Sequence, residues 1–324
     1  MKLQRHKMPG RTVLVRVAPA LTGVAGLLAL SVRAAAAEGP SAARQVPAPA
    51  GVVRVINEYL AAKSAHNPDR SMSFFDRGNT TYVDATLGWK FPTWDSLKAL
   101  FSKYMSQWPT AARSYQTEVL GDAQGAVMFF TNTPQEFGHE IRGIAVVDIR
   151  NGKFVRWVDY WDGRHFGVSA TESLRTPPAQ FPADFGESRV GESAAPAMTR
   201  IVGELSTDFA RDNSEQAAQL FAPDAVLEDL TLHTAIVGRQ SIAAYLARAL
   251  PSLPYGQGAQ VRHVVGGAAG GGYEWTNPGA SAPRGVNAIK LNSRGQIVQL
   301  TSIWDGSLVT PAWITQHMSL TIES

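Results

Sequence analysis

The sequence of 324 residues contains no cysteine. A disulfide-stabilised scaffold, a thiolate metal site and a cysteine nucleophile are therefore excluded together. Histidine is scarce as well: there are seven, and no two stand at a ligand spacing such as H-x-H or H-E-x-x-H. The sequence therefore predicts no bound metal.

Nucleotide-binding fingerprints are also missing. The chain has no Gly-x-Gly-x-x-Gly motif, and the glycine-rich stretch at residues 266–272 is not followed by the Lys-Ser or Lys-Thr of a phosphate loop. We therefore expect no nicotinamide, flavin or other cofactor. The glycine-rich stretch is interpreted as a flexible hairpin turn.

No charge of one sign dominates the body of the chain. Lys and Arg total 30 against 27 Asp and Glu, but six of the basic residues and none of the acidic ones precede Glu38. Without residues 1–37 the balance becomes 24 basic against 27 acidic side chains, a net charge of −3. Because this leaves no basic surface for phosphate, no nucleic-acid partner is expected.

The amino terminus has the order of an export signal. Basic residues from Lys2 to Arg16 precede an uncharged apolar run at residues 17–32, and small side chains follow at residues 34–37. This run is shorter than the roughly 20 residues that a spanning helix needs. We expect cleavage after Ala37 by the general secretion route, which gives a periplasmic or secreted protein without a membrane attachment. Retention of the run as an anchor is the alternative.

The rest of the chain is an internal repeat. Residues of the first half recur in the second half at offsets of 145 and then 143, as in the pairs Asp84 and Asp229, Thr131-Asn132 and Thr276-Asn277, and Trp161-Asp162-Gly163 and Trp304-Asp305-Gly306. The repeat predicts two homologous domains, residues 52–167 and 199–310, followed by a tail at 311–324. The proline-rich segment between them, residues 168–198, is interpreted as a surface linker.

Each half begins with helices and continues with strands. Apolar spacing predicts amphipathic helices at residues 52–60 and 201–209, and Thr93 is a natural cap for a helix at residues 93–105. Strand-forming segments are expected at residues 80–87, 114–120, 126–132, 141–149, 154–160 and, in the second half, 225–232. This order predicts an α+β fold in which helices pack on one face of a curved, mostly antiparallel sheet.

This order of elements, with the segment Gly-Lys-Phe-Val-Arg-Trp-Val-Asp-Tyr-Trp-Asp at residues 152–162, resembles the nuclear transport factor 2-like (NTF2-like) superfamily. Within it the chain is most similar to SnoaL-like polyketide cyclases and limonene epoxide hydrolases, over residues 52–166 and more weakly over 199–309. The resemblance implies two tandem cone-shaped α+β barrels. Because members of this fold often pair through their open sheet faces, it also implies a pseudo-twofold pair within one chain, and a monomer. It does not select one function, since the fold serves isomerases, dehydratases, cyclases, hydrolases and inert binding modules.

A candidate acid–base group lies in the segment that carries the resemblance. Strand alternation puts Trp157, Asp159 and Trp161 on one face, and the resemblance implies that this face lines the cone. Enclosure by tryptophans would raise the pKa of the Asp159 carboxyl and suit it to proton transfer near neutral pH. The resemblance also implies roles for Tyr82, as a hydrogen-bond donor to substrate, and for Asp84, as a supporting carboxylate. The alternative is that Asp159 is a structural hydrogen-bond acceptor.

Other residues of the first domain are weaker candidates. Asn132 and His139, together with the two tryptophans, are predicted to contact substrate, although an exposed loop position without a role is the alternative for His139. The stretch at residues 128–133 lacks the Arg and second Asp that epoxide hydrolases use. An epoxide hydrolase of that type is therefore not expected.

The second domain does not repeat the candidate pair. Ser302 replaces Asp159 and Leu227 replaces Tyr82, whereas Asp229 persists. Asp229, His263 and Glu274 are candidates for a different pocket in this domain, and the alternative is that it has no site. Asp162 and Asp305 recur in both copies and are interpreted as structural.

The sequence thus favours a cofactor-independent enzyme whose first domain acts by acid–base catalysis on a small, largely apolar molecule, as a cyclase, isomerase, dehydratase or hydrolase. The alternative is a non-catalytic module of the same fold that binds a small molecule or another protein.

Overall fold

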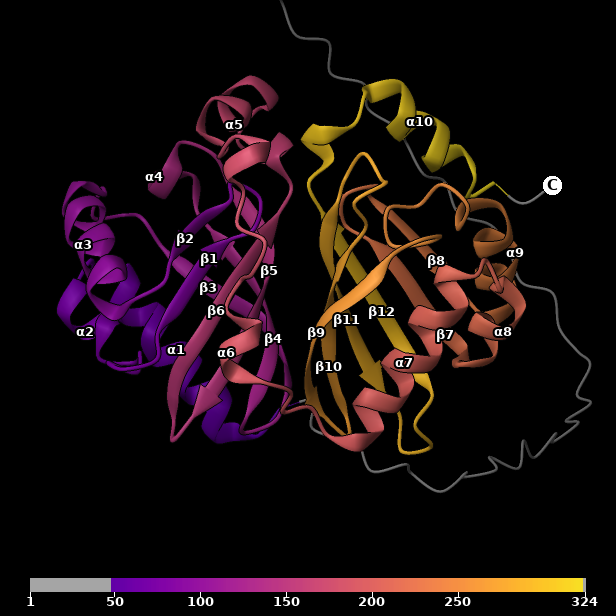
Figure 1. The fold of residues 1–324 in the computed structure, drawn as a ribbon, viewed down its shortest axis with the longest axis horizontal. Coiled ribbons are helices and arrows are strands. Elements are labelled where there is room, and N and C mark those ends of the chain that lie inside the picture. Colours follow the sequence, from indigo (N-terminus) through magenta and orange to yellow (C-terminus); the bar gives the residue numbers. More distant parts are fainter. Residues whose placement is uncertain (1–47, 323–324) are drawn as a thin grey trace, which may run out of the picture. The chain divides into compact units, whose positions relative to one another are not determined.

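The computed structural model describes residues 48–322, so the predicted export signal at residues 1–37 lies outside the described residues. Residues 43–324 form one compact unit. Each half of this unit contains a six-stranded sheet with helices on one face (Figure 1). The predicted α+β class and the predicted duplication are confirmed.

The first domain follows the predicted order closely. Its helices are α1 (Ala50–Ser64), α2 (Pro68–Met72), α3 (Trp94–Tyr104), η1 (Met105–Gln107), α4 (Pro134–Phe137) and η2 (Gly163–His165), and its strands are β1 (Thr81–Asp84), β2 (Trp89–Phe91), β3 (Ser114–Gly121), β4 (Gly125–Asn132), β5 (Ile141–Arg150) and β6 (Lys153–Trp161). Thr93 caps α3 through a capping box with Ser96, as its position predicts. The short elements α2, β2 and α4 were not predicted.

The second domain repeats this order. Its helices are α7 (Pro196–Ala210), α8 (Ser214–Gln219), α9 (Arg239–Ala249), η4 (Gly306–Leu308) and α10 (Pro311–Ser319), and its strands are β7 (Phe221–Asp229), β8 (Thr234–Val237), β9 (Gln260–Gly267), β10 (Gly270–Thr276), β11 (Arg284–Leu291) and β12 (Ile297–Trp304). Most of the predicted tail is helix α10, which contributes Ile314 to the domain's core.

The two sheets have the same topology. Their strand orders are β2-β1-β6-β5-β4-β3 and β8-β7-β12-β11-β10-β9. All neighbours are antiparallel except β1 with β6 and β7 with β12, which are parallel. The parallel pair in the first sheet sets Tyr82 opposite Trp157 and Asp84 opposite Asp159, and this register positions the candidate residues.

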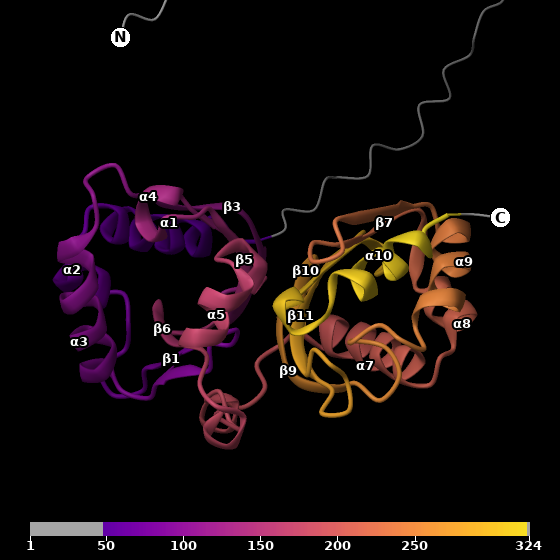
Figure 2. The same ribbon diagram turned by 90° about the horizontal axis from the view of Figure 1, so that it is seen from above.

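Each sheet has a concave face covered by its own helices (Figure 2). In the first domain this face is aromatic: Tyr59 of α1 makes edge contacts with Phe75, Phe154 and Trp157 at ring-centroid distances of 5.4, 5.4 and 4.9 Å. Large buried rings of this kind supply much of the apolar area that a small domain hides from water.

The other faces of the two sheets share a third core. It contains Val127 and Val158 from the first sheet together with Val265 and Ile303 from the second. A Cβ atom on Gly272 would lie 2.8 Å from Val127 Cγ1 and 2.5 Å from the carbonyl oxygen of Asn287. The interpretation of residues 266–272 as a flexible turn is therefore wrong: most of these glycines belong to β9 and β10, where they let another chain segment approach closely.

The segment between the domains is packed against both of them. It contains α5 (Val168–Leu174), η3 (Pro178–Gln180) and α6 (Glu187–Val190). The backbone N–H of Thr176 donates to the carbonyl of Leu87 at 2.8 Å, and Phe185 is fully buried in the core between the sheets. The prediction of a surface linker missed this burial because a lone aromatic residue among prolines has no periodicity to reveal it.

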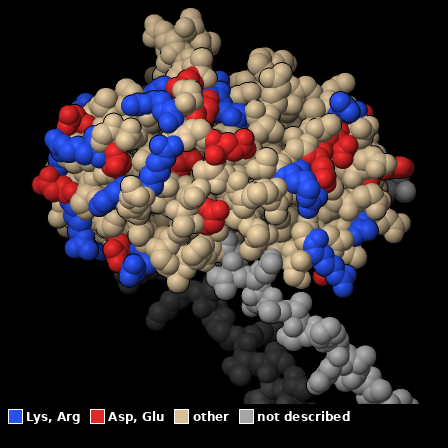
Figure 3. Space-filling view, turned by 60° about the horizontal axis from the view of Figure 1, so that its bottom comes forward, with Lys and Arg blue, Asp and Glu red and all other residues tan. Residues whose placement is uncertain are grey.

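Basic and acidic side chains are interspersed on the face drawn in Figure 3. Among residues 48–322, no helix combines the length and the apolar character needed to cross a membrane.

Candidate active site

The predicted strand alternation holds in β6. Trp157 and Trp161 lie in the concave core of the first domain, whereas Val158 and Tyr160 lie in the core between the sheets. Asp159 projects from the concave face and is half-buried. The structure therefore brings Asp159 to the position that the sequence predicted.

Asp159 and Tyr82 form a hydrogen-bonded pair. The Tyr82 hydroxyl donates a short hydrogen bond to Oδ2 of Asp159, and the Trp157 indole N–H donates to Oδ1 at 2.7 Å. Burial raises the pKa of the Asp159 carboxyl, and the bonds from Tyr82 and Trp157 and the charge of Lys63 oppose that rise only in part. Burial and the nearby Asp159 raise the pKa of Tyr82 well above its usual value, so the tyrosine remains a donor.

Asp84 holds the chain around it. Its Oδ1 accepts from the backbone N–H groups of Thr86 and Leu87 at 3.0 and 2.8 Å, and its Oδ2 accepts from the Trp161 indole at 3.0 Å. Burial raises its pKa to about 7. Its bonds fix the loop after β1 and the orientation of Trp161, so Asp84 shapes the wall of the site.

A second polar cluster faces the same concave core. Lys63 Nζ of α1 pairs with Glu136 Oε1 of α4 at 2.9 Å and donates to Asn132 Oδ1 of β4 at 3.2 Å. The Ser114 hydroxyl lies 2.7 Å from Glu136 Oε2 and 2.8 Å from the same Asn132 oxygen. The side chains of Lys63 and Glu136 are only 15% and 1% exposed. The charges of both residues act on the pKa of Asp159, which places the ion pair beside the candidate acid–base group.

The sequence analysis missed Lys63 and Glu136. Lys63 stands in the last turn of a helix, where lysine is common, and Glu136 lies in a segment expected to be a loop, so neither had a motif to mark it. Asn132 was predicted and belongs to the cluster. His139 is exposed, with its ring 5.6 Å from that of Phe166, in agreement with the alternative of a surface loop position.

Asp229 of the second domain is the counterpart of Asp84 in its contacts as well as in its sequence position. It accepts from the backbone N–H groups of Thr231 and Leu232, both at 2.9 Å, and from the Trp304 indole at 3.1 Å. A fourth donor, the Tyr255 hydroxyl, lies at 3.1 Å. Because this arrangement recurs where the Asp159–Tyr82 pair is missing, it is a structural feature of the repeat.

His263 and Glu274 do not share a pocket with Asp229, and that part of the prediction is wrong. Glu274 accepts from Arg156 Nη2 at 2.6 Å and from the Tyr160 hydroxyl at 2.7 Å, and His263 Nε2 lies 2.8 Å from Asp148. Both side chains thus point to the face shared with the first sheet. The repeat contains the reason: Glu274 aligns with Phe129, which packs against the core between the sheets.

Asp162 and Asp305 are structural, as interpreted. Asp162 caps η2 by accepting from the backbone N–H of Arg164, and Asp305 caps η4 by accepting from that of Ser307, both at 2.9 Å. Asp305 also accepts from the backbone N–H of Gly163 at 3.0 Å. The two caps therefore join the ends of the repeats.

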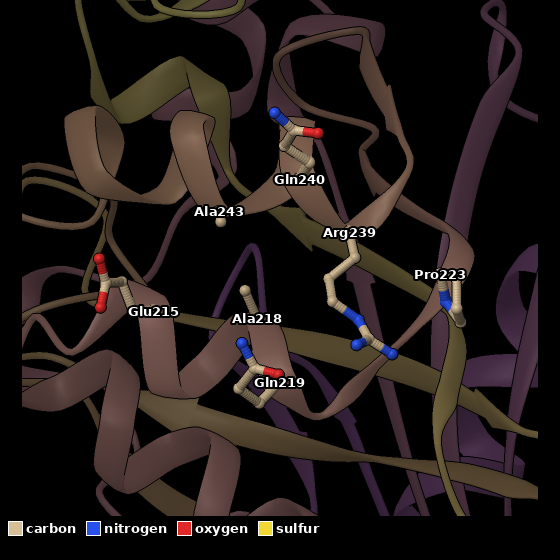
Figure 4. A pocket seen from close by; sticks show the side chains of 7 residues that line it. All are labelled: Glu215, Ala218, Gln219, Pro223, Arg239, Gln240 and Ala243. Carbon is tan, nitrogen blue, oxygen red and sulfur yellow. The ribbon is translucent and has the colours of Figure 1, made fainter.

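A hollow on the outer surface of the second domain contains none of the predicted site residues. It lies beside α8 and α9 and is lined by Glu215, Ala218, Gln219, Pro223, Arg239, Gln240 and Ala243 (Figure 4). The Arg239 guanidinium is engaged with the carbonyl of Phe221 at 2.7 Å. Among residues 48–322, no group of three or more His, Asp or Glu side chains is arranged to hold a metal ion.

No protein-family model matches the chain, and no curated protein matches it. Similar solved structures include an NTF2-like protein of unknown function from Burkholderia xenovorans, at 16% identity and a TM-score of 0.30, over 45% of this chain and 96% of that one. A steroid delta-isomerase from Pseudomonas aeruginosa matches at 13% identity and a TM-score of 0.32, over 40% and 93%. A protein described as a SnoaL-like polyketide cyclase from Shewanella denitrificans matches at 14% identity and a TM-score of 0.32, over 39% and 98%. These neighbours belong to the superfamily that the sequence resembles, and the two sheets fit two tandem copies of its fold.

Proposed function

We propose that the first domain is a cofactor-independent enzyme that moves a proton on a small, largely apolar molecule. The observation that carries this proposal is the Asp159–Tyr82 pair, a half-buried carboxyl with a raised pKa on an aromatic concave face. A carboxyl whose pKa moves toward neutrality exchanges protons more effectively at neutral pH than an exposed one. Such a pair at a closed, apolar surface is a common arrangement in active sites.

Each residue has a distinct part in the proposed reaction. Asp159 is the base that removes the proton and the acid that returns it, since each of its oxygens retains a lone pair beyond the bond from Tyr82 or Trp157. Tyr82 donates a hydrogen bond to the carboxylate and, once Asp159 is protonated, can donate to an oxygen of the substrate. The ammonium of Lys63 stabilises negative charge that develops on the substrate.

A β,γ-unsaturated ketone tests the proposal without a known substrate. With cyclohex-3-enone as probe, Asp159 would remove the proton between alkene and carbonyl and return it to the γ-carbon, which gives the conjugated enone without any other reactant. Absorbance of the conjugated product reports the rate. We expect Asp159→Asn to lower it by about 10² to 10⁴, whereas Asp224→Asn, an exposed aspartate of the second domain, leaves it unchanged.

A non-catalytic binding module is the second candidate, and one observation favours it. Both oxygens of Asp159 already accept hydrogen bonds from neighbouring side chains, as a structural carboxylate would. In that case the wild-type protein quenches its tryptophan fluorescence on binding the ketone but does not accelerate its isomerisation. Asp159→Asn would then change the melting temperature and no rate.

We also propose that the protein is exported, on the basis of the charge asymmetry and apolar run of residues 1–37. Amino-terminal sequencing of protein recovered from the cell envelope or medium should begin at Glu38. A sequence that begins at Met1 would contradict cleavage.

A further inference from the structure

The concave face of the second domain carries a row of polar side chains. Strand register sets Asp229 of β7 opposite Ser302 of β12, Ser302 opposite Asn287 of β11, and Asn287 opposite Tyr273 of β10. The same row in the first domain reads Asp84, Asp159, Ala145 and Met128. The second domain has thus lost the acid–base carboxylate and gained an amide and a phenol at the next two positions.

Four polar atoms of this face have no hydrogen-bond partner among residues 48–322. They are Ser302 Oγ, Asn287 Oδ1, Tyr245 OH of α9 and Trp275 Nε1 of β10. All four residues are at most 1% exposed. An unpaired buried polar group costs roughly 1–3 kcal/mol, so native proteins rarely retain several in one place without a further molecule that satisfies them.

These groups belong to one enclosed region. The Tyr255 ring lies 6.0 Å from that of Trp275, and its hydroxyl contacts Asp229, whose charge also acts on Tyr245. Asn287 Nδ2 donates to the Tyr273 hydroxyl at 2.7 Å, which turns its unpaired oxygen to the same face. Apolar side chains of the second core surround the row.

Helix α10 closes this region. Figure 2 shows α10 across the end of the second domain, and its Trp313 ring lies 5.5 Å from Trp304. The corresponding helix of the first domain, α5, buries only Thr171 among its residues. The concave face of the second domain is therefore sealed, whereas that of the first leaves Asp159 half-exposed.

The unpaired atoms define the chemistry of an occupant. Asn287 Oδ1 needs a donor, Trp275 Nε1 needs an acceptor, and the hydroxyls of Ser302 and Tyr245 can serve as either. Asp229 already accepts four hydrogen bonds, and no item of this row is cationic, so a charged ligand would have no counter-ion. One hydroxyl group on an apolar body meets these needs, because it donates to the Asn287 oxygen while it accepts from Ser302 across the strand pair.

We propose that the second domain is a separate binding site for a small, uncharged alcohol, held by Ser302 and Asn287 with Tyr245 and Trp275 beside them. The site is independent of the chemistry proposed for the first domain. It predicts that a hydroxyl compound binds better than the matching ketone, since a ketone cannot donate to Asn287.

Calorimetric titration of the full chain with propan-2-ol, cyclopentanol and cyclohexanol, and with cyclohexanone as the ketone control, tests this site. We expect saturable binding of at least one alcohol to one site, with weaker binding of the ketone. Ser302→Ala and Tyr245→Phe remove hydroxyls that have no partner, so both variants should fold and keep or raise the melting temperature. Each should weaken alcohol binding roughly tenfold, whereas Ser102→Ala, at an exposed position of α3, should not change it.

The proposal would be overturned by the absence of saturable alcohol binding, or by binding that neither Ser302→Ala nor Tyr245→Phe weakens. A crystal structure of the alcohol-soaked protein with water alone beside Ser302 and Asn287 would overturn it as well. None of these results depends on whether the first domain isomerises the ketone probe, so the two proposals can fail separately.

Discussion

At the scale of single residues, the repeat provides an internal comparison between equivalent carboxylates. Asp84 and Asp229 accept from the same backbone positions and the same tryptophan, yet Asp229 is fully buried and Asp84 is not. Burial raises the pKa of Asp229 to about 6 and that of Asp84 to about 7. Because both copies keep this carboxylate, it belongs to the fold, and Asp159 is the acid that distinguishes the first domain.

The Tyr82–Asp159 bond can be tested by a change of one atom. Tyr82→Phe removes the hydroxyl that favours the charged carboxylate, so the pKa of Asp159 should rise further above its usual value. Titration of the Asp159 carboxyl carbon by NMR measures this shift. Tyr104→Phe is the matched control because Tyr104 is 38% exposed. An unchanged or lowered pKa in Tyr82→Phe would contradict the assigned hydrogen bond.

Asp229 should make stability depend on pH. Its folded pKa, about 6, lies above its unfolded value near 4, so the folded state binds the extra proton between these values and stability falls as pH rises from 4 to 6. The difference corresponds to about 3 kcal/mol at most. Urea unfolding at pH 4 and pH 7 should therefore show a smaller loss for Asp229→Asn than for the wild type. Equal losses would show that Asp229 does not titrate in this range.

The sequence predicted the candidate residues of one strand well and those of the second domain poorly, for the same physical reason. Alternation along β6 fixes which side chains face the helices, and Trp157, Asp159 and Trp161 obey it. His263 and Glu274 lie in strands joined by a bulge between Glu274 and Trp275, so the face of each residue depends on a pairing register that one strand alone does not contain.

At the scale of elements, strands and helices with strong periodicity were predicted to within a few residues, whereas short elements and close approaches were not. Residues 141–149 and 154–160 correspond to β5 and β6 because long apolar runs with a turn between them leave few alternatives. The glycines of β10 were misread because composition does not show whether glycine serves a turn or a contact. Their function became clear only from the neighbouring side chain, Val127.

The contact at Gly272 gives a prediction for β10. Gly272→Val places a branched side chain where a Cβ atom alone would lie 2.8 Å from Val127 Cγ1, so the core between the sheets must separate. We expect a loss of about 1–3 kcal/mol in the free energy of unfolding. Gly203→Ala in α7 is the control: a Cβ atom there has nothing within 4 Å, and it should stabilise the helix by about 0.5–1 kcal/mol. Equal effects of the two substitutions would rule out a close contact at Gly272.

At the scale of the whole molecule, the two domains are joined by a buried network of charges as well as by apolar contacts. The Arg156 guanidinium, fully buried, lies 2.6 Å from Glu274 of the second sheet and 3.3 Å from Asp148 of its own. His263 approaches the other side of Asp148 at 2.8 Å, and the carbonyl of Phe185 accepts from Arg156 Nε at 3.1 Å. Such a network stabilises only one arrangement of the partners, because any shift leaves a charge unpaired in the interior.

Arg156 should therefore control whether the two domains unfold together. Arg156→Met retains most of the side-chain volume but leaves Glu274 and Asp148 buried without their cation, which typically costs about 3–5 kcal/mol. We expect differential scanning calorimetry to show one transition for the wild type and, for Arg156→Met, a lower melting temperature with two separated transitions. The double variant Arg156→Met/Glu274→Leu removes both charges of the closest pair and should recover part of the loss. Arg294→Met, at an exposed position of the second domain, should leave the trace unchanged. A loss below about 1 kcal/mol in Arg156→Met, within the range of an exposed ion pair, would show that the apolar core alone holds the domains together.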